Sequence, residues 1–188
     1  MLTVACVEWG NYQGRGEDYV ERLRAGVARH LNAAHRFECI RPEGGLRGWW
    51  NKIELFRPGR FSGRVLYFDL DTLIVGPIDP LAEYEGILHL ADWGWKQNDY
   101  GSGVMVWNAG EHAAIWTQYN DEVPRDFRGD QDWIKTVSVW AALPKGLCVS
   151  YRYHCKAGIP ASASVVCFHG KDKPHNAAAD WVAEHWRV

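Results

Sequence analysis

The chain has 188 residues, of which 47% are hydrophobic and 23% charged, a balance typical of a globular domain rather than a disordered or fibrous chain. We therefore expect residues 1–188 to form a single domain. The 21 Lys and Arg residues nearly balance the 23 Asp and Glu residues, for a net charge of −2, which argues against a nucleic-acid partner or an anionic membrane surface.

The sequence also argues against membrane insertion and secretion. No apolar run approaches the length that crosses a bilayer, so we expect no transmembrane segment. The N-terminal stretch MLTVACVEWG lacks the basic start of a secretory signal peptide. The five cysteines are odd in number and lack the paired spacing of a metal site, which favours reduced thiols in a cytoplasmic protein.

The hydrophobic pattern predicts strands that alternate with helices. The expected strands are residues 3–8, 36–41, 64–69, 87–92, 102–107, 147–151 and 165–169. The expected helices are residues 17–31, 49–56, 111–120, 130–140 and 180–186. In the first helix apolar residues recur every four positions, as on a helix with one buried face. The alternation predicts an α/β fold with a mostly parallel central sheet flanked by helices.

Two aspartates, Asp69 and Asp71, follow the apolar run VLYF with one residue between them. Ligands of α/β sheets gather at the carboxyl ends of strands, and a turn after the strand would bring both carboxylates to one hard cation. Such oxygen ligands suit Mg²⁺ or Mn²⁺, especially where a phosphate completes the coordination. Turn chemistry before Thr72 is the alternative. A carboxylate beside so apolar a strand is costly without a partner, so we predict a metal site.

Two classes of enzyme use this pattern in different ways. In haloacid-dehalogenase-like phosphatases the first aspartate, here Asp69, is the nucleophile. That motif carries a small β-branched residue where this chain has Leu73, and its strand usually opens the chain, whereas this one follows more than sixty residues. In nucleotide-sugar glycosyltransferases the aspartate pair instead holds a cation that binds the donor diphosphate. The rest of the chain favours the second class.

Several segments, in order, resemble those of the glycogenin-like family-eight glycosyltransferases, which include bacterial polysaccharide and lipopolysaccharide sugar transferases. DLDTLIVGPID resembles the metal motif of that family, and GSGVMVW resembles the segment near the donor sugar. GDQD resembles the Asp-Gln pair beside the anomeric carbon, and VVCFHGKDKPH resembles the C-terminal motif. The resemblance covers most of the chain. It implies a GT-A nucleotide-diphospho-sugar transferase fold, a UDP-sugar donor, Mn²⁺ (or Mg²⁺), and retaining transfer to a saccharide acceptor.

The resemblance also implies roles for particular residues. The metal ligands would be Asp69, Asp71 and His169. Contacts to the donor nucleotide and diphosphate would come from Glu8, Tyr19, Lys52, Leu70, Gly170, Lys171 and Lys173, with Tyr19 stacked on the uracil ring. Gln131, supported by Asp130, would position the reacting sugar rather than attack it. The donor or acceptor sugar would contact Asp92, Trp93, Gly101, Ser102 and Asp132.

Purely structural roles are alternatives to several of these assignments. Asp130 also fits a helix N-cap, Tyr19 fits the apolar stripe of its helix, and Asp92 fits an Asx-turn. Two departures from the family stand out: Gly101 replaces a common asparagine, and Lys173 follows His169 by four residues instead of six. With so short a region for an acceptor, a nucleotide-sugar-binding protein without catalysis remains a third class.

Overall fold

The computed structural model describes residues 1–42, 45–90 and 99–188. Within them the strands are β1 Leu2–Val7, β2 His35–Ile40, β3 Arg64–Phe68, β4 Thr72–Ile74, β5 Gly86–His89, β6 Tyr100–Asn108, β7 Cys148–Ser150 and β8 Val165–Cys167. The α-helices are α1 Gly16–His30, α2 Asp79–Glu83, α3 Ala114–Thr117, α4 Val123–Asp126, α5 Asp130–Val137, α6 Tyr151–His154 and α7 Asp180–His185. Short 3-10 helices are η1 Tyr12–Gly14, η2 Gly48–Phe56 and η4 Pro174–Asn176.

The main sheet of the described residues has five strands in the order β2-β1-β3-β6-β5. β1 runs parallel to β2 and β3, whereas β6 runs antiparallel to β3 and to β5. The predicted α/β fold is confirmed, but the sheet is mixed rather than mostly parallel. The link from β5 to β6 is ten residues long, from 90 to 99, too short for the helical crossover that parallel strands need.

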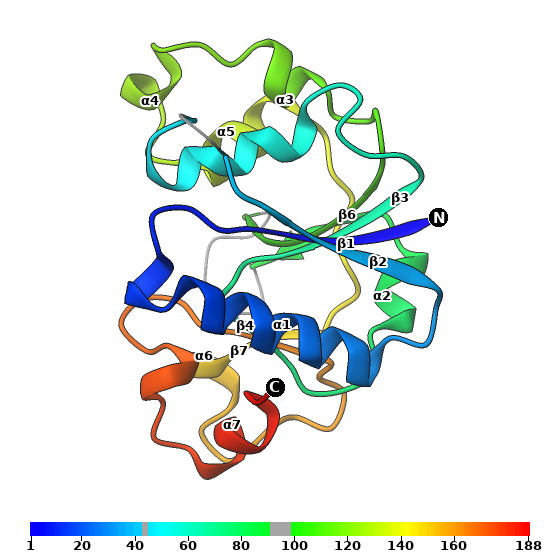
Figure 1. Cartoon of the computed structure of the whole chain (residues 1–188), viewed down its shortest axis with the longest axis vertical. Coiled ribbons are helices and arrows are strands. Elements are labelled where there is room, and N and C mark those ends of the chain that lie inside the picture. The colour runs from blue at the N-terminus through cyan, green and yellow to red at the C-terminus, as the bar shows by residue number, and fades with distance from the viewer. Residues whose placement is uncertain (43–44, 91–98) are drawn as a thin grey trace.

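A second, smaller sheet in the order β4-β8-β7 lies on one side of the main sheet, together with α1, α6 and α7 (Figure 1). The helices η2, α3, α4 and α5 cover the opposite side. In β4, antiparallel pairing with β8 brings the segment after Asp71 next to the segment before His169. The segments that carry Asp71 and His169 therefore lie side by side in this small sheet.

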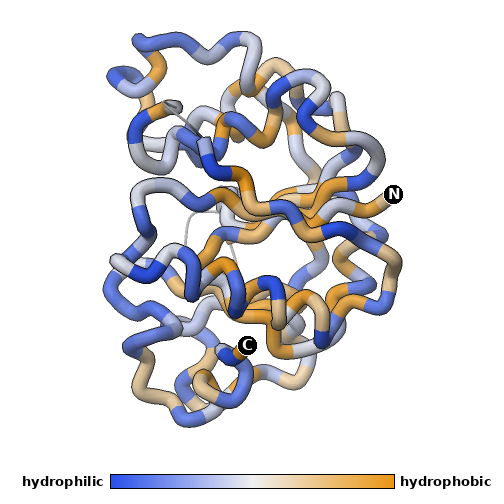
Figure 2. The backbone as a smooth tube through the Cα atoms, viewed as in Figure 1, coloured by the Kyte–Doolittle hydropathy of each residue, from blue (hydrophilic) through white to orange (hydrophobic). Residues whose placement is uncertain are grey.

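Both faces of the main sheet are buried, as the apolar run in residues 64–69 predicted. Leu66 and Phe68 pack in a core with α1, whereas Val65 and Tyr67 pack in a second core with η2 and α5. Alternate residues of a strand point to opposite faces, so one strand serves both cores. Figure 2 shows the most hydrophobic segments in the central strands and hydrophilic segments on the surrounding loops.

Two predicted helices differ from expectation. Residues 49–56 form the 3-10 helix η2, in which Trp50, Ile53 and Phe56 are all buried. About three residues per turn place these side chains on one face. Residues 111–120 contain only the four-residue α3, because His112 adopts a left-handed φ of 57° just before it. In the part of the chain that the structure describes, no helix is long and apolar enough to cross a membrane.

Candidate functional site

A turn after β3 places Asp69 and Asp71 at the carboxyl end of that strand. The Asp69 amide donates to the carbonyl of Gly103 on β6 at 2.8 Å, and the Thr72 hydroxyl donates to the Asp69 carbonyl at 2.7 Å. Leu70, between the aspartates, is 5% exposed and packs into the core. Burial of this residue leaves both carboxylates beside the pockets described next.

Two adjoining pockets share Asp69, Asp71 and Gln131. The larger pocket, of about 500 Å³, is also lined by Thr72, Leu88, Leu90, Gly101, Gly103, Cys167, Phe168, His169, Gly170 and Lys173. The smaller pocket, of about 280 Å³, is also lined by Val7, Trp9, Tyr12, Trp49, Lys52, Tyr67, Leu70, Ser102 and Asp130. The smaller one is rich in aromatic rings, and the larger one carries the C-terminal His-Gly segment.

Asp71 accepts hydrogen bonds from two side chains. The Lys173 ammonium lies 2.5 Å from Asp71 Oδ2, and the Tyr12 hydroxyl donates to the same oxygen at 3.0 Å. The backbone amide of Tyr12 in turn donates to Glu8 Oε1 at 3.3 Å. Burial, followed by the negative charge of Asp71, raises the pKa of Tyr12, so this phenol stays a neutral donor. Glu8 therefore supports Tyr12, which carries the contact to Asp71.

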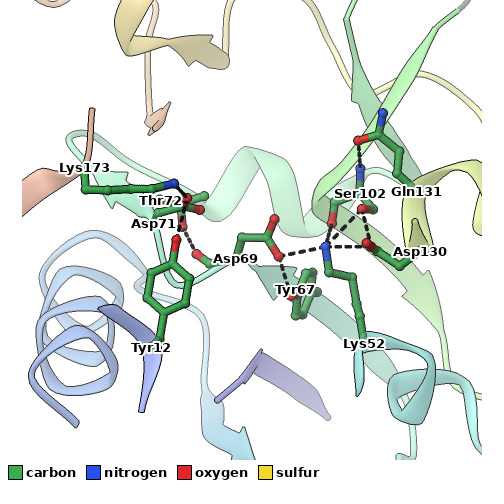
Figure 3. A network of polar contacts seen from close by, with 10 residues as sticks. All are labelled: Tyr12, Lys52, Tyr67, Asp69, Asp71, Thr72, Ser102, Asp130, Gln131 and Lys173. Carbon is green, nitrogen blue, oxygen red and sulfur yellow. Dashed lines mark hydrogen bonds and ion pairs between the residues drawn. The ribbon is translucent and has the colours of Figure 1, made fainter. Parts of the chain in front are cut away.

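Asp69 lies in a second network, centred on the buried ammonium of Lys52 (Figure 3). Lys52 Nζ is 2.9 Å from Asp69 Oδ1, 2.9 Å from Asp130 Oδ2 and 3.0 Å from the Ser102 hydroxyl oxygen. The Ser102 hydroxyl donates to Asp130 at 2.8 Å, and the Tyr67 hydroxyl donates to Asp69 at 2.6 Å. One buried cation thus bridges two carboxylates from different elements.

The surroundings of these groups set their charge. Burial lowers the pKa of Lys52, but the carboxylates of Asp130 and Asp69 outweigh it, and the pKa is raised above its ordinary value. Burial, and then Asp69, raises the pKa of Tyr67. At neutral pH Lys52 is therefore a cation and Tyr67 a neutral hydrogen-bond donor. The contacts of Tyr67 with Asp69 and of Tyr12 with Asp71 were not predicted from the sequence.

His169 lines the larger pocket but is engaged elsewhere. Its Nε2 lies 2.7 Å from the Ser150 hydroxyl, and its ring stacks against Tyr153 at 5.5 Å between centroids. Burial lowers the pKa of His169, which keeps the imidazole neutral. Among residues 1–42, 45–90 and 99–188, no group of three His, Cys, Asp or Glu is close enough to hold a metal ion. Asp69, Asp71 and His169 thus share a pocket without forming a closed ligand cluster.

Other predicted residues lie away from the pockets. Tyr19 is fully buried, donates or accepts at His175 Nδ1 over 2.6 Å, and contacts the edge of Tyr12. Its ring is not presented for stacking; Tyr12 is the tyrosine that lines the smaller pocket. Asp132 pairs with Arg128 and Lys135 instead of facing the pockets. The stacking role of Tyr19 and the sugar contact of Asp132 therefore have no support in this geometry.

The remaining predicted residues divide between the pocket and its margins. Gly101 lines the larger pocket, and a Cβ on the nearby Gly103 would lie 3.3 Å from Asp69 Oδ2. Gly170 also lines that pocket with a left-handed φ of 76°, a conformation that favours glycine. Lys171 is exposed beside it. Asp92 and Trp93 lie outside the described residues.

Tyr12, Tyr67 and Trp49 were missed as candidate site residues. Tyr67 lies two positions before Asp69, and residues two apart on a strand share a face, so its contact was foreseeable from the alternation. Tyr12 and Trp49 carry no such local signal, because the Gly-rich turn and η2 bring them to the pocket through folding.

No family model and no curated protein matches this chain. Among solved structures it is similar to the galactosyltransferase LgtC in complex with donor and acceptor sugar analogues, at 14% identity and a TM-score of 0.67 over 97% of this chain and 93% of that one. It is also similar to the glycosyltransferase GlyE of Streptococcus pneumoniae TIGR4, at 15% identity and a TM-score of 0.64. That match covers 95% of this chain, which spans 58% of the length of GlyE.

A third similar structure is a glycosyltransferase involved in the glycosylation of the major capsid of PBCV-1, at 16% identity and a TM-score of 0.63 over 91% of this chain and 94% of that one. This chain has the fold of GT-A glycosyltransferases. At such low sequence identity, the structural similarity shows the fold alone. A fold does not determine a reaction, so the reaction has to follow from the residues of the pockets.

Proposed function

We propose that the protein is a metal-dependent glycosyltransferase of the glycogenin-like family-eight type. It would move a sugar from a nucleotide-sugar donor, a UDP-sugar, to a saccharide acceptor with retention of configuration. The observation that carries this proposal is the meeting of two pockets at Asp69, Asp71 and Gln131. An elongated donor that crosses from one pocket to the other would place its diphosphate beside the two carboxylates.

Each part of such a donor has a matching environment. The smaller pocket offers the rings of Trp9, Tyr12 and Trp49 to a nucleobase, and aromatic faces bind bases by stacking. The larger pocket offers Gln131 and Gly101 to a sugar. Between them, Lys173 lies close enough to Asp71 to pair with a diphosphate bound there. The donor would therefore lie with its base in the smaller pocket and its sugar in the larger one.

Asp69, Asp71 and His169 would hold Mn²⁺ or Mg²⁺. Their donor set fits the ion: two carboxylates and a neutral imidazole line one pocket, and ligation requires the neutral ring. When bound, the ion supplies positive charge that stabilises the departing nucleoside diphosphate. Tyr12 and Tyr67 donate to the carboxylates and hold their orientation. Such outer contacts fix the direction of metal ligands.

The protein side chains would position and stabilise rather than react covalently. Gln131 would orient the anomeric carbon from the first turn of α5, which the Lys52–Asp130 ion pair anchors. Lys173 would neutralise charge that develops on the leaving diphosphate, an effect worth most in a pocket with little water. The leaving phosphate would take the proton of the acceptor hydroxyl, so the protein needs no strong general base.

The two alternatives are weaker. A phosphatase would need Asp69 free as a nucleophile, but Lys52 and Tyr67 both bind its Oδ1, and the fold is that of glycosyltransferases. A nucleotide-sugar-binding protein without catalysis fits the same pockets. Turnover of a donor separates that class from an enzyme.

The test is calorimetric titration with UDP, in the presence and absence of Mn²⁺, on wild type, Asp71→Asn and Asp132→Asn. The last variant is the control, because Asp132 is a carboxylate that pairs with Arg128 outside both pockets. We expect Mn²⁺-dependent binding that Asp132→Asn retains. Loss of an outer-shell partner alone weakens metal binding about 10–100-fold, so Asp71→Asn should weaken UDP binding at least about 100-fold. Equal affinities for all three proteins would refute the proposal. If UDP binds as expected, hydrolysis of a UDP-sugar then separates an enzyme from a binding protein.

A further inference from the structure

Two cysteines face each other on neighbouring strands. Cys6 of β1 and Cys39 of β2 are register partners in a parallel pair, so their side chains lie on the same face of the sheet. Neighbouring strands lie about 4.8 Å apart, which is within the usual Cα separation of about 4.4–6.8 Å for a disulfide. Each of the two neighbouring thiols shifts the pKa of the other.

The two thiols have different surroundings. Cys6 is fully buried, and Cys39 is half-buried on β2 at the end of the sheet order. The neighbouring Cys6 thiol lowers the pKa of Cys39; burial opposes this effect, and the guanidinium of Arg41 adds to it. The neighbouring Cys39 thiol, with burial, raises the pKa of Cys6. Cys39 is therefore the thiol that ionises first, with a protonated thiol beside it.

The other cysteines lack this arrangement. Cys148 and Cys167 lie on neighbouring strands, but their register partners are Val165 and Ser150. Burial raises the pKa of Cys148 to about 12 and that of Cys155 to about 11. Buried thiols with raised pKa values react slowly. These cysteines provide internal controls for reactivity.

We propose that Cys6 and Cys39 form a redox-active dithiol that a peroxide oxidises to a disulfide. The Cys39 thiolate attacks peroxide, an S–O bond forms, the O–O bond breaks, and the leaving hydroxide takes a proton to give water. The Cys6 sulfur then attacks the Cys39 sulfenic acid: the S–S bond forms, the S–O bond breaks, and the Cys6 proton leaves with hydroxide as a second water. Two thiols and one peroxide give one disulfide and two waters.

The position of the pair connects it to the candidate site. Glu8 follows Cys6 by two residues, and its amide donates to the Ile40 carbonyl of β2 at 2.9 Å. Glu8 accepts from the Tyr12 amide, and the Tyr12 hydroxyl donates to Asp71. A disulfide would hold the ends of β1 and β2 together next to Glu8, from which these hydrogen bonds lead to Asp71. The proposal itself concerns the thiols and stands whether or not the protein transfers sugars.

The experiment treats the full chain with hydrogen peroxide and maps its peptides by mass spectrometry. In wild type we expect a cross-link between the peptides that contain Cys6 and Cys39, with loss of two hydrogen atoms and reversal by dithiothreitol. Cys6→Ala should stop at a Cys39 sulfenic acid that dimedone traps, and Cys39→Ser should give neither product. Cys155→Ser should behave as wild type.

The wild-type map is independent of how well any variant folds. A Cys39 sulfenic acid in wild type without the cross-link would overturn the proposal, as would a dimedone-trapped sulfenic acid at Cys6 in Cys39→Ser. Brief labelling with iodoacetamide adds a second measurement, in which Cys39 should react before Cys148, Cys155 and Cys167. Equal labelling of Cys39 and Cys155 would contradict the reactivity assigned to Cys39.

Discussion

Replacement of Lys52 by methionine removes an ammonium that Asp69 and Asp130 share. Methionine keeps the length and apolar stem of lysine but has no charge and no donor. The side chains of Lys52 and Asp130 are each 10% exposed, whereas that of Asp69 is 32% exposed. Among the described residues, the variant therefore leaves Asp130 as a buried carboxylate whose remaining side-chain donor is the Ser102 hydroxyl.

The expected loss of stability follows from these exposures. Removal of one partner from a buried ion pair costs about 3–5 kcal/mol, because the remaining charge stays buried without compensation. We assign this cost to Asp130, since water screens the more exposed Asp69. In a chain of this size each kcal/mol lowers the melting temperature by about 2–4 °C, so a decrease of about 6–20 °C is expected. Lys171→Met, at an exposed position, should change the free energy of unfolding by less than about 0.5 kcal/mol.

Urea unfolding, followed by the fluorescence of the eleven tryptophans, measures this difference. The double variant Lys52→Met/Asp130→Asn should recover part of the loss, because the amide no longer carries a buried charge and still accepts from Ser102. A loss below about 1 kcal/mol for Lys52→Met, or no recovery in the double variant, would refute the argument that Lys52 compensates a buried carboxylate.

Three further predictions concern the site and the sheet. Lys173→Met should bind Mn²⁺ more tightly than wild type, because the lysine ammonium pairs with Asp71 at 2.5 Å and competes with the ion. The same variant should bind UDP more weakly with Mn²⁺ present, because it lacks the ammonium proposed to pair with the diphosphate. Titration with each ligand separates the two effects, and an unchanged Mn²⁺ affinity would contradict the first. Gly86→Ala should lower the free energy of unfolding by about 3 kcal/mol, since a Cβ there would lie 2.6 Å from the Ala141 carbonyl oxygen. Gly59→Ala, which meets no atom within 4 Å, should cost about 1 kcal/mol through its backbone conformation alone, and equal losses would refute the clash. Burial and Asp69 raise the pKa of Tyr67 in the folded state. The stability that this shift contributes is therefore present below the unfolded pKa of about 10 and is lost as the pH rises above that value. In urea unfolding at increasing pH, Tyr67→Phe should lose less stability above pH ~10 than wild type, and an equal loss would contradict the prediction.

The local signals of the sequence located the two aspartates and the elements around them. The apolar run before Asp69 predicted a strand covered on both faces, and the strand β3 is buried in that way. The four-residue repeat predicted the helix that became α1, from Gly16 to His30. Such signals are readable because burial of a strand or a helix face depends on residues a few positions apart.

Pairing between distant segments was decided only by the tertiary structure. The short link from β5 to β6 was visible in the predicted strands 87–92 and 102–107, but the antiparallel pairing of β6 with the distant β3 was not. The sequence placed Tyr19 on the apolar stripe of its helix, and the structure buries its ring there. That Tyr12 rather than Tyr19 lines the smaller pocket became visible only in the folded chain.

The same holds for the partners of the aspartates. Lys173 reaches Asp71 across 102 positions of the chain, and Lys52 binds Asp69 and Asp130, both of which follow it along the sequence, Asp130 far beyond Asp69. The residue types and the predicted strand ends determined that two carboxylates would lie together at the end of a strand. The packing of η2, α5 and the C-terminal segment against that edge decided which cations neutralise them, because a side-chain contact between distant residues exists only once the elements that carry them are packed together.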